Sequence, residues 1–225
     1  MNPNNLVSLE ELNVPIRSDE ALEWVESLLK RFYKSKLGTE FIRLKKGITQ
    51  EILDELLPLS KYAKAYYNTP DVLLQFYPGC KTSYDADFIC CRGSLIERVE
   101  VTMAIDGQQS RIQAEAIQEY GHSPIYQTPK FTGNSRNRKV FETESETISN
   151  EDIIEIQVDR IQKAYANKHK NIHKYPNVTL LIGVDIPLFV ESECLQILEK
   201  LNIFDNTFDS IKCVNTSSHQ YWCLK

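Results

Sequence analysis

Two neighbouring stretches of the sequence decide the fold: SYDADFICC at residues 83–91 and LIERVEVTMA at residues 95–104. Both are rich in branched, aromatic and other apolar residues, which is typical of β-strands, and the linker between them is short enough for an antiparallel hairpin. Each stretch also carries carboxylates on a face that would otherwise be apolar. Burying an unpaired carboxylate is costly unless a cation, a metal ion or hydrogen-bond donors compensate. The sequence therefore places the candidate functional site on this hairpin.

Helical and strand patterns on both sides of the hairpin predict an α/β protein. The expected elements are, in chain order, a helix from Ser18 to Gly38, a helix from Thr49 to about Tyr67 divided at Pro58, strands at 72–77, 84–91 and 95–104, a helix at 151–173, a strand at 178–184, a helix at 191–201, and strands at 211–215 and 220–224. We expect one central mixed sheet, an antiparallel meander plus further strands, flanked by helices. We divide the chain into an N-terminal helical region, 1–48, and an α/β domain, 49–225, with a long loop excursion at about 122–148.

Composition and charge exclude several classes of function. The net charge of the 225 residues is −5, so nucleic-acid binding would need local basic patches within an acidic whole. The six cysteines show no Cys-x-x-Cys spacing, which argues against a zinc site or a disulfide framework. No glycine-rich phosphate loop is present. The N-terminus does not resemble a signal peptide, and the longest apolar stretch, 178–190, is too short to span a bilayer, so we expect a cytoplasmic protein.

The carboxylates of the hairpin suggest a metal site. Alternation along a strand puts Asp85 and Asp87 on one face, and the hairpin can bring Asp87 close to Glu100. Mg²⁺ and Mn²⁺ prefer oxygen ligands, commonly one or two carboxylates with substrate phosphate and water. We predict Asp87 and Glu100 as ligands of Mg²⁺ (or Mn²⁺), with Asp85 as an outer contact. The alternative is that Asp87 pairs with Arg98, Asp85 lies in a turn and Glu100 faces solvent.

The same residues resemble a known motif. Asp87-Phe88, followed thirteen residues later by Glu100-Val101-Thr102, is similar to the core of the PD-(D/E)xK nuclease superfamily, also called restriction-endonuclease-like. Its members place an Asp on one strand and Glu/Asp-x-Lys on the next, after an N-terminal helix, and the order of elements over roughly residues 49–215 agrees. The resemblance implies a restriction-endonuclease-like fold and a metal-dependent endonuclease that hydrolyses phosphodiester bonds of nucleic acid, with DNA as the expected substrate. Members often work as homodimers, which makes a homodimer an expected assembly.

The chain departs from the family pattern at two positions. Ala86 stands where proline is frequent, and Thr102 stands where the family has its catalytic lysine. In the family this lysine positions or activates the attacking water and offsets charge on the phosphate, which threonine cannot do as a cation. Two interpretations stay open. Another lysine replaces it, or the domain is catalytically inactive and serves as a nucleic-acid-binding or protein-interaction scaffold.

The helix expected at 151–173 offers a replacement. Lys168 falls on its apolar stripe, where a lysine is out of place unless its ammonium reaches a partner, so we predict a catalytic role. The alternative is that Lys168 reaches water near the helix end. Gln157 lies on the same side, roughly two to three turns earlier, and the family often uses a glutamine on this helix. Glu55, on the helix before the meander, is a candidate additional acid, with an ordinary exposed glutamate as the alternative.

Basic residues gather in the long loop. No acidic residue separates them, and an aromatic residue, Phe131, lies among them. The basic residues are Lys130, Arg136, Arg138 and Lys139. We predict that they contact nucleic-acid phosphates, with an affinity that falls as salt rises. The alternative is a solvated loop without this role.

Overall fold

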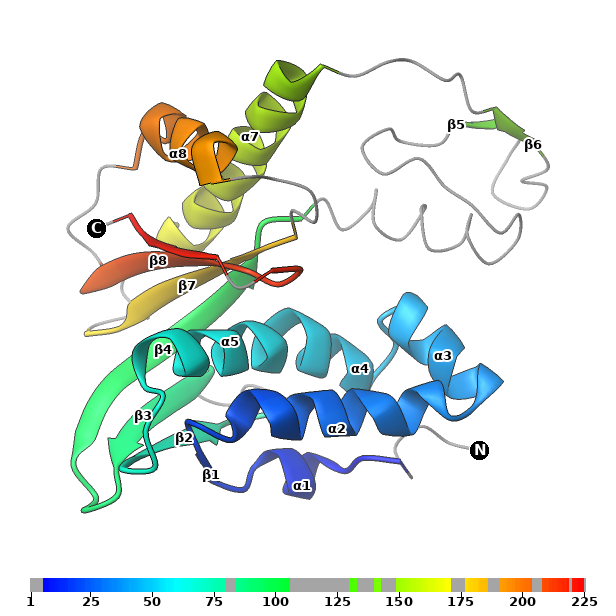
Figure 1. The fold of residues 1–225 in the computed structure, drawn as a ribbon. Helices are drawn as coiled ribbons and strands as arrows, with labels where there is room; N and C mark the ends of the chain where they lie inside the picture. Colours follow the sequence, from blue (N-terminus) through cyan, green and yellow to red (C-terminus); the bar gives the residue numbers. More distant parts are fainter. Residues whose placement is uncertain are drawn as a thin grey trace.

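A mixed sheet of seven strands, in the order β1-β2-β3-β4-β7-β8-β9, lies at the centre of the described part of the protein (Figure 1). The computed structural model describes residues 6–79, 84–105, 130–132, 140–142, 149–170, 177–185, 191–203, 208–218 and 220–224. The strands are β1 (Ile16–Arg17), β2 (Val72–Phe76), β3 (Ala86–Cys90), β4 (Leu95–Met103), β7 (Thr179–Val184), β8 (Ser210–Asn215) and β9 (Tyr221–Cys223). Strands β1 to β4 are antiparallel, β4, β7 and β8 are parallel, and β9 returns antiparallel.

Helices cover both faces of this sheet. They are α1 (Leu9–Leu12), α2 (Ala21–Tyr33), α3 (Lys36–Arg43), α4 (Ile48–Glu51), the π-helical turn η2 (Ile52–Leu56), α5 (Leu57–Tyr66), α7 (Asn150–His169) and α8 (Glu191–Lys200). In Figure 1, α2 and α5 run side by side on one side of the sheet, and α7 and α8 lie on the other. The mixed sheet flanked by helices confirms the predicted α/β class. In the part of the chain that the structure describes, no helix combines the length and the apolar character needed to cross a membrane.

Alternation along the central strands separates two hydrophobic cores. Val99 and Val101 of β4 and Leu181 of β7 belong to the core beneath α2 and α5. Leu180 and Ile182 of β7 belong to the core beneath α7 and α8. Because side chains alternate along β4, Glu100 points to the α7 face. Strand β4 thus presents Val99 and Val101 to one face of the sheet and Glu100 to the other.

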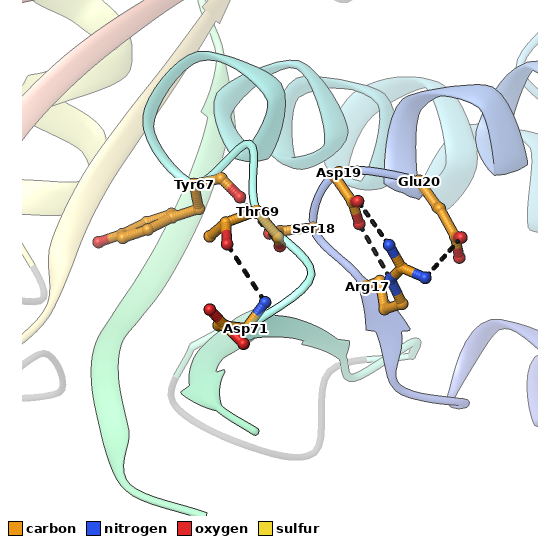
Figure 2. Close-up of polar contacts among 7 residues, drawn as sticks. All are labelled: Arg17, Ser18, Asp19, Glu20, Tyr67, Thr69 and Asp71. Carbon is orange, nitrogen blue, oxygen red and sulfur yellow. Dashed lines mark hydrogen bonds and ion pairs between the residues drawn. The ribbon is translucent and has the colours of Figure 1, made fainter. Parts of the chain in front are cut away.

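The N-terminal residues are tied to the rest of the chain by one buried serine. Ser18 does not cap a helix as its sequence context predicts, because α2 begins at Ala21 without a side-chain cap. Its hydroxyl instead donates to the backbone carbonyls of Tyr67 and Thr69, which link the end of α5 to β2 (Figure 2). Strand β1 also pairs with β2, so residues before 49 contribute to the same sheet and core as those after it.

Two other helix boundaries differ from the sequence expectation. The sequence predicts one helix that ends at Gly38, whereas α2 ends at Tyr33 and α3 begins after Ser35. The Ser35 hydroxyl accepts a hydrogen bond from the Gly38 N–H. Gly38 therefore lies inside a helix instead of ending one. Its α-carbon packs against the backbone of Phe32, so close that an added Cβ would lie 2.2 Å from the Phe32 carbonyl oxygen.

Pro58 widens the helix before the meander without breaking it. Proline supplies no N–H to the preceding turn. The chain adopts a π-helical turn there, in which the Leu57 N–H donates to the Ile52 carbonyl, and α5 continues from Leu57. Single π-helical turns occur frequently at functional sites. This turn contains Glu55.

The predicted loop excursion at 122–148 includes a small separate sheet. Strands β5 (Lys130–Thr132) and β6 (Val140–Glu142) pair antiparallel, with Phe131 opposite Phe141. Lys130 is the first residue of β5. The other three residues of the predicted basic patch, Arg136, Arg138 and Lys139, lie outside the described residues.

Candidate functional site

The α7 face of β3 and β4 carries the predicted acids. Asp87 pairs directly with Arg98, and directly paired residues of antiparallel strands point to the same face. Glu100 follows Arg98 by two residues and shares that face. Asp87 and Glu100 therefore lie on one side of the sheet, as the sequence predicts.

A β-bulge sets this register. The pairing of β3 with β4 shifts between Phe88 and Ile89, so that Ile89 faces Leu95 while Phe88 faces Glu97. A one-residue shift moves every following side chain to the other face. Without the bulge, Asp87 would pair with Glu97. The bulge thus brings Asp87 of β3 to the same face as Glu100.

Asp85 lies directly before β3, and its carboxylate lies against β4. Its backbone N–H donates to the Val99 carbonyl at 3.0 Å. Its Oδ2 accepts the Val101 N–H at 2.7 Å, in a buried hydrogen bond. The two donor–acceptor pairs bracket Glu100 along β4. The structure therefore brings Asp85 beside Glu100, the place that the sequence analysis assigned to Asp87.

Lys168 reaches the same carboxylate from α7. Its Nζ donates to Oε1 of Glu100, in an ion pair whose glutamate side chain is 5% exposed and whose lysine side chain is 26% exposed. Helix α7 begins at a capping box formed by Ser149 and Asp152. Lys168 lies in its last turn, so the ammonium arrives from a separate element of the fold. The structure thus brings together the lysine and the glutamate that the sequence analysis paired.

Glu55 adds a further acid to the cluster. Burial, together with the nearby charge of Asp85, raises the pKa of Glu55 from 4.5 to about 8. Glu100 is affected in the same way: burial and the Asp85 carboxyl raise its pKa, and the positive charge of Lys168 opposes the rise. Oε2 of Glu55 is buried and has no hydrogen-bond partner among the described residues. Burial and neighbouring like charges thus act on both Glu55 and Glu100 in this cluster.

The donor set suits a hard divalent cation. Within the described residues, three carboxylates, from Glu55, Asp85 and Glu100, lie near the ammonium of Lys168. Within the described ranges, no three His, Cys, Asp or Glu side chains enclose a metal ion by themselves. Mg²⁺ does not require this, because it commonly binds through one or two carboxylates and completes its shell with water and substrate phosphate. Asp85 and Glu100, with the unpaired oxygen of Glu55, fit such an ion.

Asp87 belongs to an adjacent aromatic cluster. Its Oδ2 accepts from the hydroxyl of Tyr77 at 2.8 Å and lies 3.5 Å from the hydroxyl of Tyr84. Burial, followed by the hydrogen bond to Asp87, raises the pKa of Tyr77. The Arg98 guanidinium lies over the Tyr84 ring, 5.4 Å from its centroid. Asp87 thus binds tyrosine hydroxyls beside Arg98, two residues before Glu100 along β4.

The remaining candidates lie at the margins of the site. Thr102 follows Glu100 on the same face of β4 and is half-buried. Gln157 is completely buried in α7, and its side-chain amide has no hydrogen-bond partner within the described chain. It precedes Lys168 by roughly three turns, or ~16 Å along the helix. The structure therefore does not bring Gln157 to the lysine end of α7.

The sequence pattern did not indicate Tyr77, Tyr84 and Arg98 as residues of the site. The signal for Arg98 was present, because a residue two positions before Glu100 on a strand must share its face. The tyrosines precede or flank a segment without clear periodicity. Their position depends on the pairing of β2 with β3, which local pattern does not reveal.

The fold and the site together define an α/β protein with a buried carboxylate–lysine cluster on one face of its sheet. No family model matches the sequence, and comparisons with curated proteins and with solved structures find no match. The chemistry of the cluster itself is therefore the basis for the function proposed below.

Proposed function

We propose that this chain is a divergent nuclease of the PD-(D/E)xK, restriction-endonuclease-like type, which hydrolyses phosphodiester bonds of DNA with Mg²⁺ or Mn²⁺. The supporting observation is the ion pair between Lys168 and Glu100. Thr102 lacks the cation that the family carries at this position, and Lys168 supplies one from α7. The order of helix, three-stranded meander, helix and parallel strand is the order that the resemblance implies.

The acids have a distinct role in this proposal. Asp85 and Glu100 hold the metal ion, and Glu55 contributes its unpaired oxygen. The ion, when bound, polarises a phosphoryl oxygen and lowers the pKa of water. The backbone hydrogen bond from Val101 fixes the orientation of Asp85. Burial of Asp85 and Glu100 keeps bulk water from competing for the site.

Lys168 supplies the cation of the mechanism. Its ammonium orients the attacking water and offsets negative charge that develops on the phosphate in the transition state. Because Lys168 is a quarter exposed while Glu100 is nearly buried, the lysine forms the open side of the pair, toward which a phosphate can approach. The basic loop residues Lys130, Arg136, Arg138 and Lys139 are proposed to contact phosphates farther from the cleaved bond.

A catalytically inactive scaffold is the second candidate. The absence of lysine at position 102 favours it, as does the partial neutralisation of Glu100 by Lys168. A scaffold would bind nucleic acid or a protein partner through the same fold. It would need neither the metal ion nor the ammonium.

A cleavage assay tests the proposal. Supercoiled plasmid and single-stranded DNA are incubated with the full chain in Mg²⁺, in Mn²⁺ and in EDTA. We expect cleavage with either metal and none with EDTA. Lys168→Met should abolish cleavage, whereas Lys163→Met is a matched control. Lys163 lies on the same helix, is 72% exposed, and pairs only with Asp159 one turn away among the described ion pairs. Metal-independent nicking, or equal activity in both variants, would contradict the proposal.

A further inference from the structure

Arg98 lies beside the acid–lysine cluster on the same face of β4. It precedes Glu100 by two residues and pairs directly with Asp87 of β3. Alternate residues of a strand are ~6.6 Å apart along it, which is close to the spacing of neighbouring phosphates on an extended nucleic-acid strand. An extended DNA strand that presents one phosphate to Glu100 and Lys168 can therefore present the next one to Arg98.

The aromatic cluster holds this arginine in place. Its guanidinium lies 5.4 Å from the centroid of the Tyr84 ring, in a cation–π contact. The Tyr84 ring in turn meets the Tyr77 ring edge-on, with centroids 5.9 Å apart. The Tyr77 hydroxyl donates to Asp87 at 2.8 Å. Asp87 thus stabilises the tyrosines on which the arginine lies.

This arrangement leaves a hydrogen-bond donor of Arg98 unused among the described residues. Its Nε is buried and has no hydrogen-bond partner among the described residues, and Oδ1 of Asp87 also lacks one there. Although the two residues are paired across the strands, Asp87 directs its other oxygen to the tyrosines. A buried guanidinium nitrogen without a partner is costly, and an anion that binds in two places with the fork of the guanidinium would satisfy it.

Arg17 shows what a structural arginine looks like in this protein. Its guanidinium donates to Asp19 at 2.7 Å and pairs with Glu20 at 3.1 Å (Figure 2). Both acids lie within three residues of it in the sequence, at the edge strand β1. Arg98 has a tyrosine ring beneath it and an acid site beside it, where a phosphate would arrive. The contrast indicates that Arg98 is held for a ligand.

We infer that Arg98 binds the phosphate next to the cleaved one and aligns the DNA backbone along β4. This inference rests on the proposed nuclease function and names a substrate-binding residue of that same site. Arginine suits the role because its planar fork matches two phosphate oxygens, which a lysine cannot do. The Tyr77, Tyr84 and Asp87 side chains act through Arg98 by orienting it.

The test measures DNA binding separately from cleavage. The wild-type chain and the variants Arg98→Gln, Arg98→Lys and Arg17→Gln are titrated against a fluorescein-labelled DNA duplex, followed by fluorescence anisotropy. Titrations are run in Ca²⁺, which occupies oxygen-ligand sites, over a series of NaCl concentrations. The slope of affinity against salt counts the phosphate contacts. Cleavage by the same preparations is measured in Mg²⁺.

We expect Arg98→Gln to weaken binding about tenfold and to reduce the salt slope by about one, the loss of one phosphate contact. Arg98→Lys should keep the slope, because its charge remains, and bind less tightly than wild type, because the fork is lost. Arg17→Gln should match wild type in both. Far-UV circular dichroism checks the fold, and Arg98→Lys carries the test if Arg98→Gln does not fold.

The outcomes separate this inference from the nuclease proposal. If wild type binds and cuts while Arg98→Gln keeps the wild-type slope and affinity, Arg98 is not a phosphate ligand and the nuclease proposal stands. If wild type binds without cutting and Arg98→Gln lowers the slope, Arg98 is a phosphate ligand, the nuclease proposal is overturned and the scaffold replaces it. A wild-type chain that neither binds nor cuts DNA overturns both.

Discussion

Glu97 and Glu100 lie on the same strand, point to opposite faces of the sheet, and are treated very differently by their surroundings. On the α5 face, Oε2 of Glu97 accepts from the hydroxyls of Tyr62 at 2.7 Å and Tyr67 at 2.8 Å. Its Oε1 accepts from Thr179 and pairs with Lys212 at 3.4 Å. Both oxygens of this partly buried carboxylate are hydrogen-bonded.

The partners of Glu97 also contact one another. Lys212 also donates to the Tyr62 hydroxyl at 2.6 Å, and its ammonium lies 5.0 Å from the centroid of the Tyr62 ring. Burial and the charge of Glu97 raise the pKa of Tyr62 and of Tyr67, which keeps both hydroxyls as donors. One negative charge is matched by one positive charge and neutral donors.

The cluster around Glu100 is open by comparison. Among the described residues, Asp85 and Glu55 bring negative charge toward it, and the ammonium of Lys168 opposes them. The same strand thus carries one satisfied glutamate and one that is crowded by like charges. A carboxylate whose oxygens are all hydrogen-bonded and whose charge is compensated has a structural role. A buried carboxylate close to other carboxylates is a candidate for binding a cation or a substrate.

The largest expected effect is a loss of stability when Glu97 is removed. Glu97→Ala should lower the free energy of unfolding by about 3–5 kcal/mol, because the largely buried ammonium of Lys212 is left without its counter-charge. Both side chains are about 15% exposed or less, so solvent screening is weak. Urea denaturation measures the loss, and the double variant with Lys212→Met should recover part of it. A loss below about 1 kcal/mol would show that the network is not the stabilising one.

The next effect is on catalysis, at the crowded side. Glu100→Gln should reduce the cleavage rate by about 10²–10³-fold, equivalent to about 2.7–4 kcal/mol of transition-state stabilisation. Its free energy of unfolding should stay equal or rise, because the cost of burying a charged carboxylate and its repulsion with Asp85 are both removed. Initial rates on plasmid DNA and urea denaturation of the same preparation give the two values. If Glu100→Gln destabilises the fold as strongly as Glu97→Ala, the distinction between the two glutamates is wrong.

Metal binding should stabilise only through the crowded cluster. At a Mg²⁺ concentration of about 100 times the Kd, the folded state should gain about 2.7 kcal/mol. Glu100→Gln should remove most of this gain, whereas Glu97→Gln should keep it, although its starting stability is lower. Thermal unfolding with and without Mg²⁺, at ionic strength matched with NaCl, measures the effect. An equal gain in both variants would indicate that the ion binds elsewhere.

The smallest effect is a pH dependence of stability in the absence of metal. Glu55 has a pKa near 8 in the folded protein and 4.5 ordinarily, so between these values the folded state binds more protons than the unfolded state. Its contribution is complete below pH 4.5 and is lost as the pH rises through about 8. The slope is up to about 1.4 kcal/mol per pH unit for one proton.

Glu55→Gln should flatten this slope, and the exposed surface variant Glu23→Gln should leave it unchanged. Urea denaturation in EDTA at several pH values between 5 and 9 provides the measurement. Stability that rises with pH over this range in wild type, relative to Glu55→Gln, would have the wrong sign for a buried acid with a raised pKa.

Much of the scaffold was accessible from local pattern. The alternation of apolar residues predicted strands β2, β3 and β4 to within a few residues, and the apolar stripe of α7 singled out Lys168 as a lysine in need of a partner. Both signals arise within one element. The helix boundaries near Ser18 and Gly38 were wrong, because the hydroxyl of Ser18 binds carbonyls some fifty residues away that no local pattern contains.

The membership of the site was only partly accessible. Glu55 was a weak candidate in the sequence because exposed helical glutamates are common. Its burial follows from the π-helical turn before Pro58 and from the packing of that turn against β4. Asp85 was assigned an outer role, since counting from the hairpin does not reveal a bulge at Phe88.

The amino-acid sequence alone determined which residues alternate on β4 and that Glu97 and Glu100 must face opposite sides, because side-chain direction along a strand depends only on position. Tertiary structure decided which of the two would be satisfied. The bulge selected the acids that join Glu100, α7 delivered Lys168, and α5 and β8 delivered the tyrosines and Lys212 to Glu97. Hydrogen bonding and charge compensation of a buried group depend on neighbours distant in sequence, and these are fixed only when the elements pack.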